Sequence, residues 1–300
     1  MILVIGTSGQ LGNALAHRLS VRDETFTAAG RPGFDFEKPE TIVTCFEATK
    51  PSLVINAAAY TAVDKAETDL KAAKAGNHTG PLALAKLCEA ADVPFIHVST
   101  DYVFDGNKGA PYLETDPTGP TGVYGTTKRD GEAAILATNA KAIILRTAWV
   151  YSAWGKNFAR TMINAGRKMH ILRVVADQRG TPTAAGDLAD AILAIIDKIR
   201  TTGWQPEYRG IFHATSRGET TWHDFAVAIF EEAAKHGYPA PQLQPIATAD
   251  WPTPTRRPPD SRLDSGKLAR VFGVRLPEWK SALPDIIANL MTQDETAKMQ

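Results

Sequence analysis

Met1-Ile-Leu-Val-Ile-Gly6-Thr-Ser-Gly9-Gln-Leu-Gly12 is the stretch that decides the predicted fold, because it joins a buried strand, a glycine turn and a helix start. Residues 2–5 form a continuous apolar run, which is typical of a central parallel strand covered on both faces. The glycines Gly6, Gly9 and Gly12 permit a tight turn, so that backbone N–H groups and the partial positive charge of the helix N-terminus can meet a pyrophosphate. We therefore predict a dinucleotide-binding turn.

Apolar runs and helical patterns alternate along the first half of the chain. The runs predict strands at residues 2–5, Phe26–Ala29, Leu53–Asn56, Phe95–Ser99 and Ala142–Arg146. Apolar residues at helical spacing predict helices at Leu11–Leu19, Pro39–Thr49, Gly80–Ala91 and Lys128–Thr138. This alternation favours right-handed βαβ units. We predict an α/β fold, a Rossmann-type doubly wound parallel sheet with a smaller, mostly C-terminal substrate-binding lobe.

The pattern changes after about residue 150, where we expect a domain boundary. Residues 1–150 would form the dinucleotide-binding domain, completed by part of 167–215, and residues 151–300 mainly a discontinuous substrate-binding lobe. In this second part we predict helices at Asn157–Gly166 and Ala185–Arg200, a strand at Gly210–Ala214 and a final helix after Trp279, with 293–300 as a frayed end.

Two features of this second part have a specific interpretation. Thr220 or Thr221 could cap a helix whose apolar stripe is more typical of core than of ligand contact; it consists of Trp222, Phe225, Ala226 and Ile229. The proline-rich stretch Ala249–Asp260 excludes a regular helix or central strand. Because Arg256 and Arg257 lie in it, we expect an ordered loop held against another part of the molecule.

Composition argues for a cytoplasmic globular protein. The 300 residues are 44% hydrophobic and 22% charged with zero formal net charge, so no global field favours nucleic acid or an anionic membrane. No apolar stretch approaches the ~20 residues that span a bilayer, and the N-terminal run is expected to be a strand and not a signal peptide. Cys45 and Cys88 are expected to be unpaired.

Polar residues follow two of the predicted strands. Asn56–Thr61 and Ser99-Thr100-Asp101 both end strands, where ligands bind in doubly wound sheets. Tyr124 and Lys128 stand four residues apart, one helical turn. Reduction of a ketone develops alkoxide charge, which needs a hydrogen-bond donor and then a proton. Tyr124 would give the proton, Lys128 would lower its pKa of about 10 and hold the nicotinamide ribose, and Thr100 would share the substrate oxygen.

The end of the second predicted strand bears on the choice of cofactor. An acidic residue there would bind the adenosine ribose of NAD, but the chain has Ala28-Ala29-Gly30-Arg31. A missing acid and a guanidinium favour a 2′-phosphate, and hence NADPH, with NADH as the alternative.

Together these motifs resemble the extended short-chain dehydrogenase/reductase family. Longer strings are similar to its dTDP-4-dehydrorhamnose reductase branch: Ala62-Val-Asp-Lys-Ala-Glu67, Leu145-Arg-Thr-Ala-Trp149-Val-Tyr151, Asn157-Phe-Ala-Arg-Thr-Met162, Asp177-Gln-Arg-Gly-Thr-Pro-Thr183 and Arg256-Arg-Pro-Pro-Asp-Ser-Arg262. The resemblance implies reduction of the C4 ketone of a dTDP-6-deoxy-hexulose. It implies that the cofactor is lined by Gly9, Gln10, Leu11, Asp35, Phe36, Ala59, Tyr60 and Thr61, and the sugar nucleotide by Thr100, Asp101 and Trp149.

The chain departs from this resemblance at a metal site. Better-known bacterial members carry a glutamate linked to Mg²⁺ at a dimer contact, and Ala14 stands at that position here. We therefore expect no metal, and a monomer or weak homodimer. The histidines have no metal-ligand spacing, and His97 is expected to be a core residue. Asp64 and Glu67 are interpreted as acids that favour a helix dipole.

Two other functions stay open at this point. The regulatory β subunit of methionine adenosyltransferase resembles these motifs but serves as a binding partner. A sugar-nucleotide epimerase or dehydratase would cycle tightly bound NAD without net consumption. Intact Thr100, Tyr124 and Lys128 favour catalysis, and Arg31 favours a reductase over an epimerase.

Overall fold

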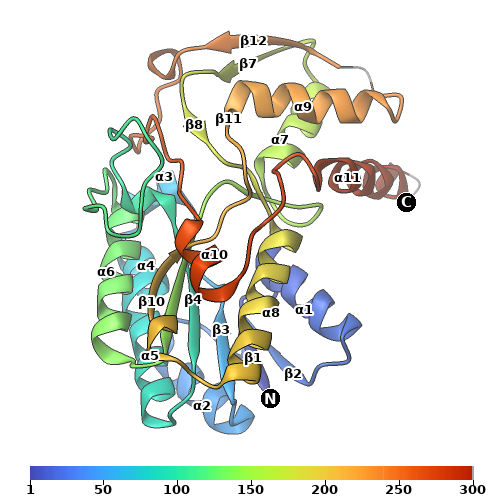
Figure 1. Cartoon of the computed structure of the whole chain (residues 1–300). Helices are drawn as coiled ribbons and strands as arrows, with labels where there is room; N and C mark the ends of the chain where they lie inside the picture. The colour runs from blue at the N-terminus through green and yellow to red at the C-terminus, as the bar shows by residue number, and fades with distance from the viewer. Residues whose placement is uncertain (239, 299–300) are drawn as a thin grey trace.

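A parallel sheet forms the centre of the protein in the computed structural model, which describes residues 1–238 and 240–298 (Figure 1). Over this range the sheet has six strands in the order β10-β5-β4-β3-β1-β2. Their bounds are Ile2–Ile5 (β1), Phe26–Ala29 (β2), Leu53–Asn56 (β3), Phe95–Thr100 (β4), Ala142–Thr147 (β5) and Gly210–His213 (β10). The Rossmann-type doubly wound sheet predicted from the sequence is confirmed.

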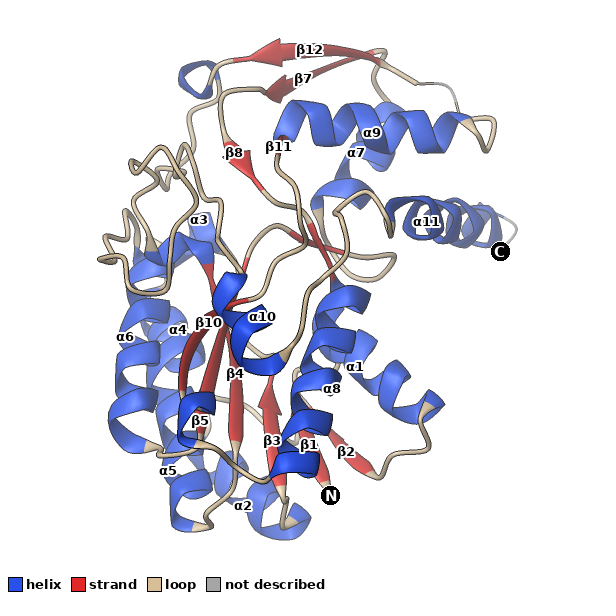
Figure 2. Ribbon diagram, in the orientation of Figure 1, coloured by secondary structure: helices blue, strands red, loops and turns tan. Residues whose placement is uncertain are grey.

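Helices cover both faces of this sheet because each central strand is apolar on both sides (Figure 2). Ile2 and Val4 of β1 belong to one core with α1 (Gln10–Val21), α8 (Ala185–Thr202) and α10 (Gly266–Phe272). Leu3 and Ile5 belong to the opposite core with α2 (Pro39–Thr49), α5 (Gly80–Ala90) and α6 (Val123–Thr138).

A second group of elements lies beyond the carboxyl ends of the strands (Figure 1). It has its own apolar core, built mainly from α7 (Phe158–Gly166), α9 (Trp222–Ala234) and α11 (Leu283–Lys298). Short strand pairs accompany it: β7 (Ile171–Val175) with β12 (Gln242–Ile246), β8 (Arg179–Gly180) with β11 (Thr220–Thr221), and β6 (Val150–Tyr151) with β9 (Thr183–Ala184).

The structure corrects several predicted elements. α6 begins at Val123 and not at Lys128, which places Tyr124 in its first turn. Three short helical segments between β3 and α5 were not predicted: α3 (Val63–Ala66), α4 (Leu70–Lys74) and the π-helix Ala75–Thr79. The short strand pairs were also missed; β6, β8, β9 and β11 have two residues each, which leave no periodic pattern in a sequence, and the five-residue β7 and β12 were not predicted either.

Other expectations hold. The side chain of Thr221 caps α9 by accepting from the backbone N–H of Asp224. Apart from a 3₁₀ turn at Thr248–Asp250, the stretch Ala249–Asp260 has no helix or multi-residue strand. The helix predicted after Trp279 is α11; it runs past Gln293 to Lys298, and residues 299–300 of the expected frayed end lie outside the described residues.

Candidate active site

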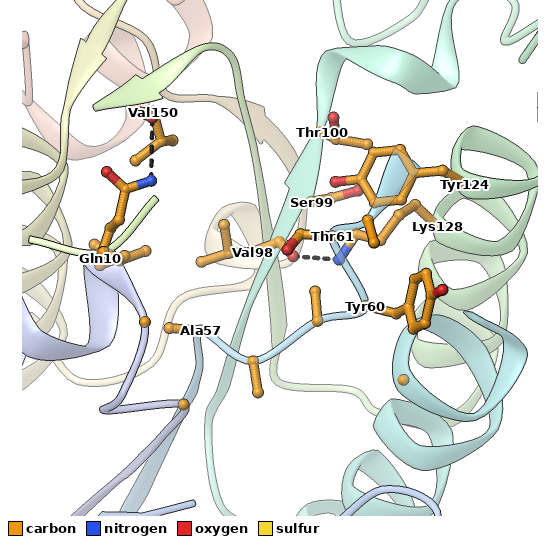
Figure 3. Close-up of a pocket in the computed structure, with 18 of the residues that line it drawn as sticks. Gln10, Ala57, Tyr60, Thr61, Val98, Ser99, Thr100, Tyr124, Lys128 and Val150 are labelled. Carbon is orange, nitrogen blue, oxygen red and sulfur yellow. Dashed lines mark hydrogen bonds between the residues drawn. The ribbon is translucent and has the colours of Figure 1, made fainter. Parts of the chain in front are cut away.

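A cavity of about 980 Å³ opens at the carboxyl ends of the central strands. The glycine turn after β1, the segment after β3, the end of β4, the first turns of α6 and the segment after β5 all contribute to its lining. Figure 3 shows these segments around one space. Residues from all parts of the predicted site therefore meet here: Gly6, Gly9, Gln10, Leu11, Arg31, Asp35, Phe36, Ala59, Tyr60, Thr61, Thr100, Asp101, Tyr124, Lys128 and Trp149.

The glycine turn packs so closely against backbone atoms that it leaves no space for side chains. Gly6 has a φ of +89°, and a Cβ there would lie 2.7 Å from the backbone nitrogen of Ala58. A Cβ at Gly12 would lie 2.1 Å from the carbonyl oxygen of Gly6. Gly12 is therefore a packing residue of the turn and does not line the cavity. The turn presents bare backbone at the N-terminus of α1, the arrangement that receives a phosphate.

Gln10, the first residue of α1, links the turn to the segment after β5. Its Nε2 donates to the carbonyl oxygen of Val150 at 3.2 Å, and its Oε1 accepts from the hydroxyl of Ser152 at 2.9 Å (Figure 3). The turn is thus tied to a segment of the chain about 140 residues away.

Arg31 lies beyond β2 and lines the cavity, with two carboxylates close by. Its Nε is 3.3 Å from Oδ1 of Asp35 and its Nη2 is 3.1 Å from Oε1 of Glu37. The absence of an acid directly after β2 is therefore offset by acids from the following loop. The Arg31 side chain is 69% exposed, so these pairs hold it only weakly.

The segment after β3 is fixed by a buried asparagine that sequence reasoning missed. Asn77, in the π-helix, accepts from the backbone N–H of Tyr60 at 2.9 Å and donates to the carbonyl oxygen of Tyr60 at 3.1 Å. It also donates to Thr127 of α6 at 3.2 Å. An isolated asparagine in a helical stretch carries no pattern that would have indicated this bridge.

Tyr124 and Thr100 lie side by side in the cavity, with Lys128 reaching toward the end of β4 (Figure 3). The Thr100 hydroxyl donates to Oδ1 of Asp101 at 3.0 Å and accepts from the backbone N–H of Tyr102 at 3.2 Å. Burial raises the pKa of Tyr124 well above its ordinary value, whereas its hydrogen bond with Thr100 lowers it. Burial also raises the pKa of Asp101 to about 6.

Lys128 lines the cavity, and its amine is held by the backbone of β4 and beside a buried histidine. Its Nζ donates to the carbonyl oxygen of Val98 at 2.6 Å and lies 3.3 Å from Nε2 of His97. Burial lowers its pKa to about 8, against the raising effect of Glu132. Burial is the largest cause of the raised pKa of Tyr124, and the role of Lys128 in lowering that pKa stays a prediction.

A buried ion pair supports the end of β4 from behind. Glu132 of α6 accepts from the Ser99 hydroxyl at 2.5 Å and from Nη2 of Arg146 at 2.6 Å. All three side chains are buried. Two buried opposite charges satisfy each other only in good geometry, so this pair holds the register between α6, β4 and β5.

Trp149 forms an aromatic wall with a residue that was assigned to the core. Its indole stacks on Trp222 with ring centroids 3.5 Å apart and planes 9° apart. A Cβ at Gly180 would lie 2.4 Å from the same indole. Phe225, Ala226 and Ile229 are buried as expected, and Trp222 packs half-buried against the same core while it also lines the cavity.

The proline-rich loop is held by Asp64 and Glu67, for which a different role was expected. Nη2 of Arg257 is 2.5 Å from Oδ2 of Asp64, and the backbone N–H of Thr255 donates to Oδ1 of Asp64 at 3.2 Å. Glu67 lies just after α3 and accepts from Thr255 and from the backbone N–H of Val123 at the start of α6. Asp64 lies in the first turn of α3, in keeping with the helix-dipole interpretation, whereas Glu67 meets the N-terminus of a different helix, α6. The loop is ordered as predicted.

Three further observations concern metals, membranes and cysteines. Among the residues that the structure describes, no group of three or more His, Cys, Asp or Glu side chains could hold a metal ion. Ala14 is partly buried against the core of α1 and α8. No helix in the described ranges is long and apolar enough to cross a membrane. Cys45 and Cys88 are free thiols.

Comparisons with known proteins agree with this geometry. The chain matches the family model of the RmlD substrate binding domain over residues 1–292. It is 40% identical over 297 residues to a dTDP-4-dehydrorhamnose reductase of Sinorhizobium fredii, covering 99% of both chains. A solved dTDP-4-dehydrorhamnose reductase from Clostridium acetobutylicum is similar with a TM-score of 0.89 and 38% identity, covering 97% of this chain and 99% of that one. The Bacillus anthracis enzyme, solved in complex with NADP, is similar with a TM-score of 0.86 and 28% identity, covering 96% and 98%.

Proposed function

The chain belongs to the RmlD substrate binding domain family of dTDP-4-dehydrorhamnose reductases, and on that premise we propose that it reduces the C4 ketone of dTDP-4-dehydro-6-deoxy-L-mannose to dTDP-L-rhamnose. As a member of this family the chain is an oxidoreductase. The observation that carries the proposal is that Tyr124, Thr100 and Lys128 share one cavity with the glycine turn.

The cavity fits a nicotinamide dinucleotide. At Gly6 and Gly12 any side chain would collide with backbone, so only glycines permit this tight turn, whose backbone a pyrophosphate can approach next to the N-terminus of α1. When bound, the dinucleotide supplies the hydride. Gly9, Gln10 and Leu11 would hold the pyrophosphate end, and Ala59, Tyr60 and Thr61 would flank the cofactor on the other side of the turn.

Tyr124 is the proton donor in this proposal. The raised pKa keeps its phenol protonated at neutral pH, so that the group enters the reaction with the proton that the alkoxide needs. Thr100 lies beside the phenol and would share the substrate oxygen. Lys128, one helical turn farther, would hold the nicotinamide ribose and stabilise the phenolate that forms once the proton has left.

On the cofactor we propose NADPH, with NADH as the alternative. Arg31 is the cation nearest to the region where an adenosine ribose would lie, beside Asp35 and Phe36 in the lining. A 2′-phosphate would compete with Asp35 and Glu37 for the Arg31 guanidinium, whereas an unmodified ribose would meet the carboxylates. The complex of the B. anthracis relative with NADP supports the first outcome.

The sugar nucleotide would occupy the end of the cavity bounded by Thr100, Asp101 and Trp149. Trp149 contributes a flat aromatic face beside Trp222, and Asp101 a carboxylate for sugar hydroxyls. We retain the division into a dinucleotide-binding part (1–150) and a mainly C-terminal substrate-binding part (151–300). It is supported by the separate apolar core of α7, α9 and α11. We also retain a cytoplasmic monomer or weak homodimer without a metal, since Ala14 offers no ligand.

One assay separates the proposal from its rivals. The purified protein is mixed with NADPH and the dTDP-4-keto sugar, and the nicotinamide absorbance is followed together with the sugar product. A reductase oxidises one NADPH for each ketone reduced. A regulatory binding subunit would bind NADPH without consuming it, and an epimerase would convert the sugar without net consumption. Either of these results would overturn the proposed function.

A further inference from the structure

The least expected neighbour of the catalytic lysine is a buried histidine. His97 of β4 is fully buried, with its Nε2 3.3 Å from Nζ of Lys128 and its Nδ1 2.9 Å from Nδ2 of Asn56. Its place as a core histidine is as predicted, but its two ring nitrogens connect the end of β3 to Lys128. None of the roles assigned so far uses this contact.

The tautomer of His97 follows from the hydrogen bonds of Asn56. Oδ1 of Asn56 accepts from the backbone N–H of Ala58 at 3.1 Å, so its amide NH₂ must face the histidine. Nδ1 of His97 then accepts, and a neutral imidazole carries its proton on Nε2. Burial and the charge of Lys128 hold the pKa of His97 well below its ordinary range, which keeps the ring neutral.

This tautomer conflicts with an ammonium at Lys128. An ammonium has three donors and no acceptor, so Nε2–H of His97 would face another donor. A neutral amine can accept a hydrogen bond from Nε2–H of His97 while it still donates to the carbonyl oxygen of Val98. Gain of a proton by Lys128 therefore requires His97 to shift its own proton to Nδ1 and Asn56 to give up its present orientation.

We propose that His97, oriented by Asn56, is a positioning residue that sets both the place of the Lys128 amine and its affinity for a proton. The inference rests on the proposed reductase function. Other groups that face Lys128 are Glu132, whose charge is shared with Arg146 of β5, and Tyr124 one turn back on α6. Glu132 raises the proton affinity of Lys128, and His97 opposes it.

One substitution, Asn56→Asp, tests the proposal because it moves the ring proton of His97 from Nε2 to Nδ1. In Asn56→Asp, one carboxylate oxygen still accepts from Ala58 while the other accepts from Nδ1–H of His97. Nε2 then becomes an acceptor that suits the Lys128 ammonium. The pH dependence of kcat/KM reports groups of the free enzyme. We expect kcat/KM of the wild-type protein to fall on the alkaline side of its pH profile, the alkaline limb, with a midpoint near pH 8. This midpoint should move upward by about one pH unit or more in Asn56→Asp, a tenfold gain in proton affinity.

The same substitution in a His97→Phe protein distinguishes an effect relayed through the histidine from a direct effect of the added negative charge. In His97→Phe the ring nitrogens are gone, so Asn56→Asp should then move the limb by less than about a third of its original shift, because a relayed effect is non-additive. Ile96→Val, on the same strand but packed in the opposite core, is the control and should leave the limb unchanged. An equal shift with and without His97 would show a simple charge effect and overturn the proposal.

A readout without turnover keeps this inference distinct from the proposed function. Nitrogen-15 NMR of histidine-labelled protein, with His97→Phe for assignment, reports the ring tautomer directly. At pH 9, above the pKa of Lys128, we expect a bare Nδ1 and a protonated Nε2 at His97. A protonated Nδ1 at that pH would overturn the inference even if the protein reduces the sugar normally. The expected tautomer in a protein without reductase activity would count against the proposed function alone.

Discussion

Replacement of Asp101 by Asn should stabilise the protein at neutral and alkaline pH while weakening its substrate site. The Asp101 carboxyl is 2% exposed, and burial raises its pKa from 3.8 to about 6. The folded protein therefore favours the protonated form. Above both pKa values the carboxylate is ionised in the folded and unfolded states, and the shift of about 2 pH units corresponds to about 3 kcal/mol lost from the free energy of unfolding.

The pH dependence of the free energy of unfolding distinguishes burial of the Asp101 carboxylate from other causes of a stability change. Below pH 3.8 the group is protonated in both states, so the penalty vanishes there and accumulates as the pH rises through 6. Asp101→Asn removes the charge and keeps the shape, so its gain over the wild type should be about 1.5 kcal/mol at pH 5 and about 3 kcal/mol at pH 8.

Urea unfolding at these two pH values measures the difference directly, and the linear extrapolation gives each free energy of unfolding. A gain that is the same at pH 5 and pH 8, or no gain at either, would refute the argument from burial. The proposed role of Asp101 adds a functional expectation. The KM for the sugar nucleotide should rise in the same variant while the affinity for NADPH stays unchanged.

Three other substitutions test the site. Tyr124→Phe should lower kcat by roughly 10²- to 10⁴-fold, because the proton donor is lost, with the Kd for NADPH nearly unchanged in a fluorescence titration; near-normal turnover would remove Tyr124 as the acid. Arg31→Ala should raise the Kd for NADPH about tenfold and leave that for NADH almost constant, and equal effects on both would exclude a 2′-phosphate contact. Gly12→Ala should lower the free energy of unfolding by about 2–3 kcal/mol, because its Cβ would lie 2.1 Å from the Gly6 carbonyl oxygen. The matched control Gly30→Ala, with no atom within 4 Å of the new Cβ, should change it by less than about 0.5 kcal/mol.

Local pattern was enough to predict most of the central sheet. β1, β2 and β3 lie at the predicted residues, because short apolar runs between turn residues permit few structures other than buried strands. α6 was predicted to begin too late, since Val123-Tyr-Gly-Thr-Thr has little apolar periodicity and its helical state depends on contacts such as that of Glu67 with the backbone of Val123. Local propensity is a weak prior when tertiary contacts decide.

What the sequence determined by itself is the glycine turn, the Rossmann-type sheet and the presence of Thr100, Tyr124 and Lys128, since each depends on spacing within a short stretch of chain. Only the tertiary structure decided what these side chains touch. Lys128 meets His97 across 31 residues of chain, and Glu67 meets Thr255 across 188. Such contacts depend on how separate elements pack, and a pattern within one element carries no information about its partner. The residues proposed for carbonyl reduction can thus be predicted from the sequence. The hydrogen bonds that set the proton affinities of these residues are visible only in the tertiary structure.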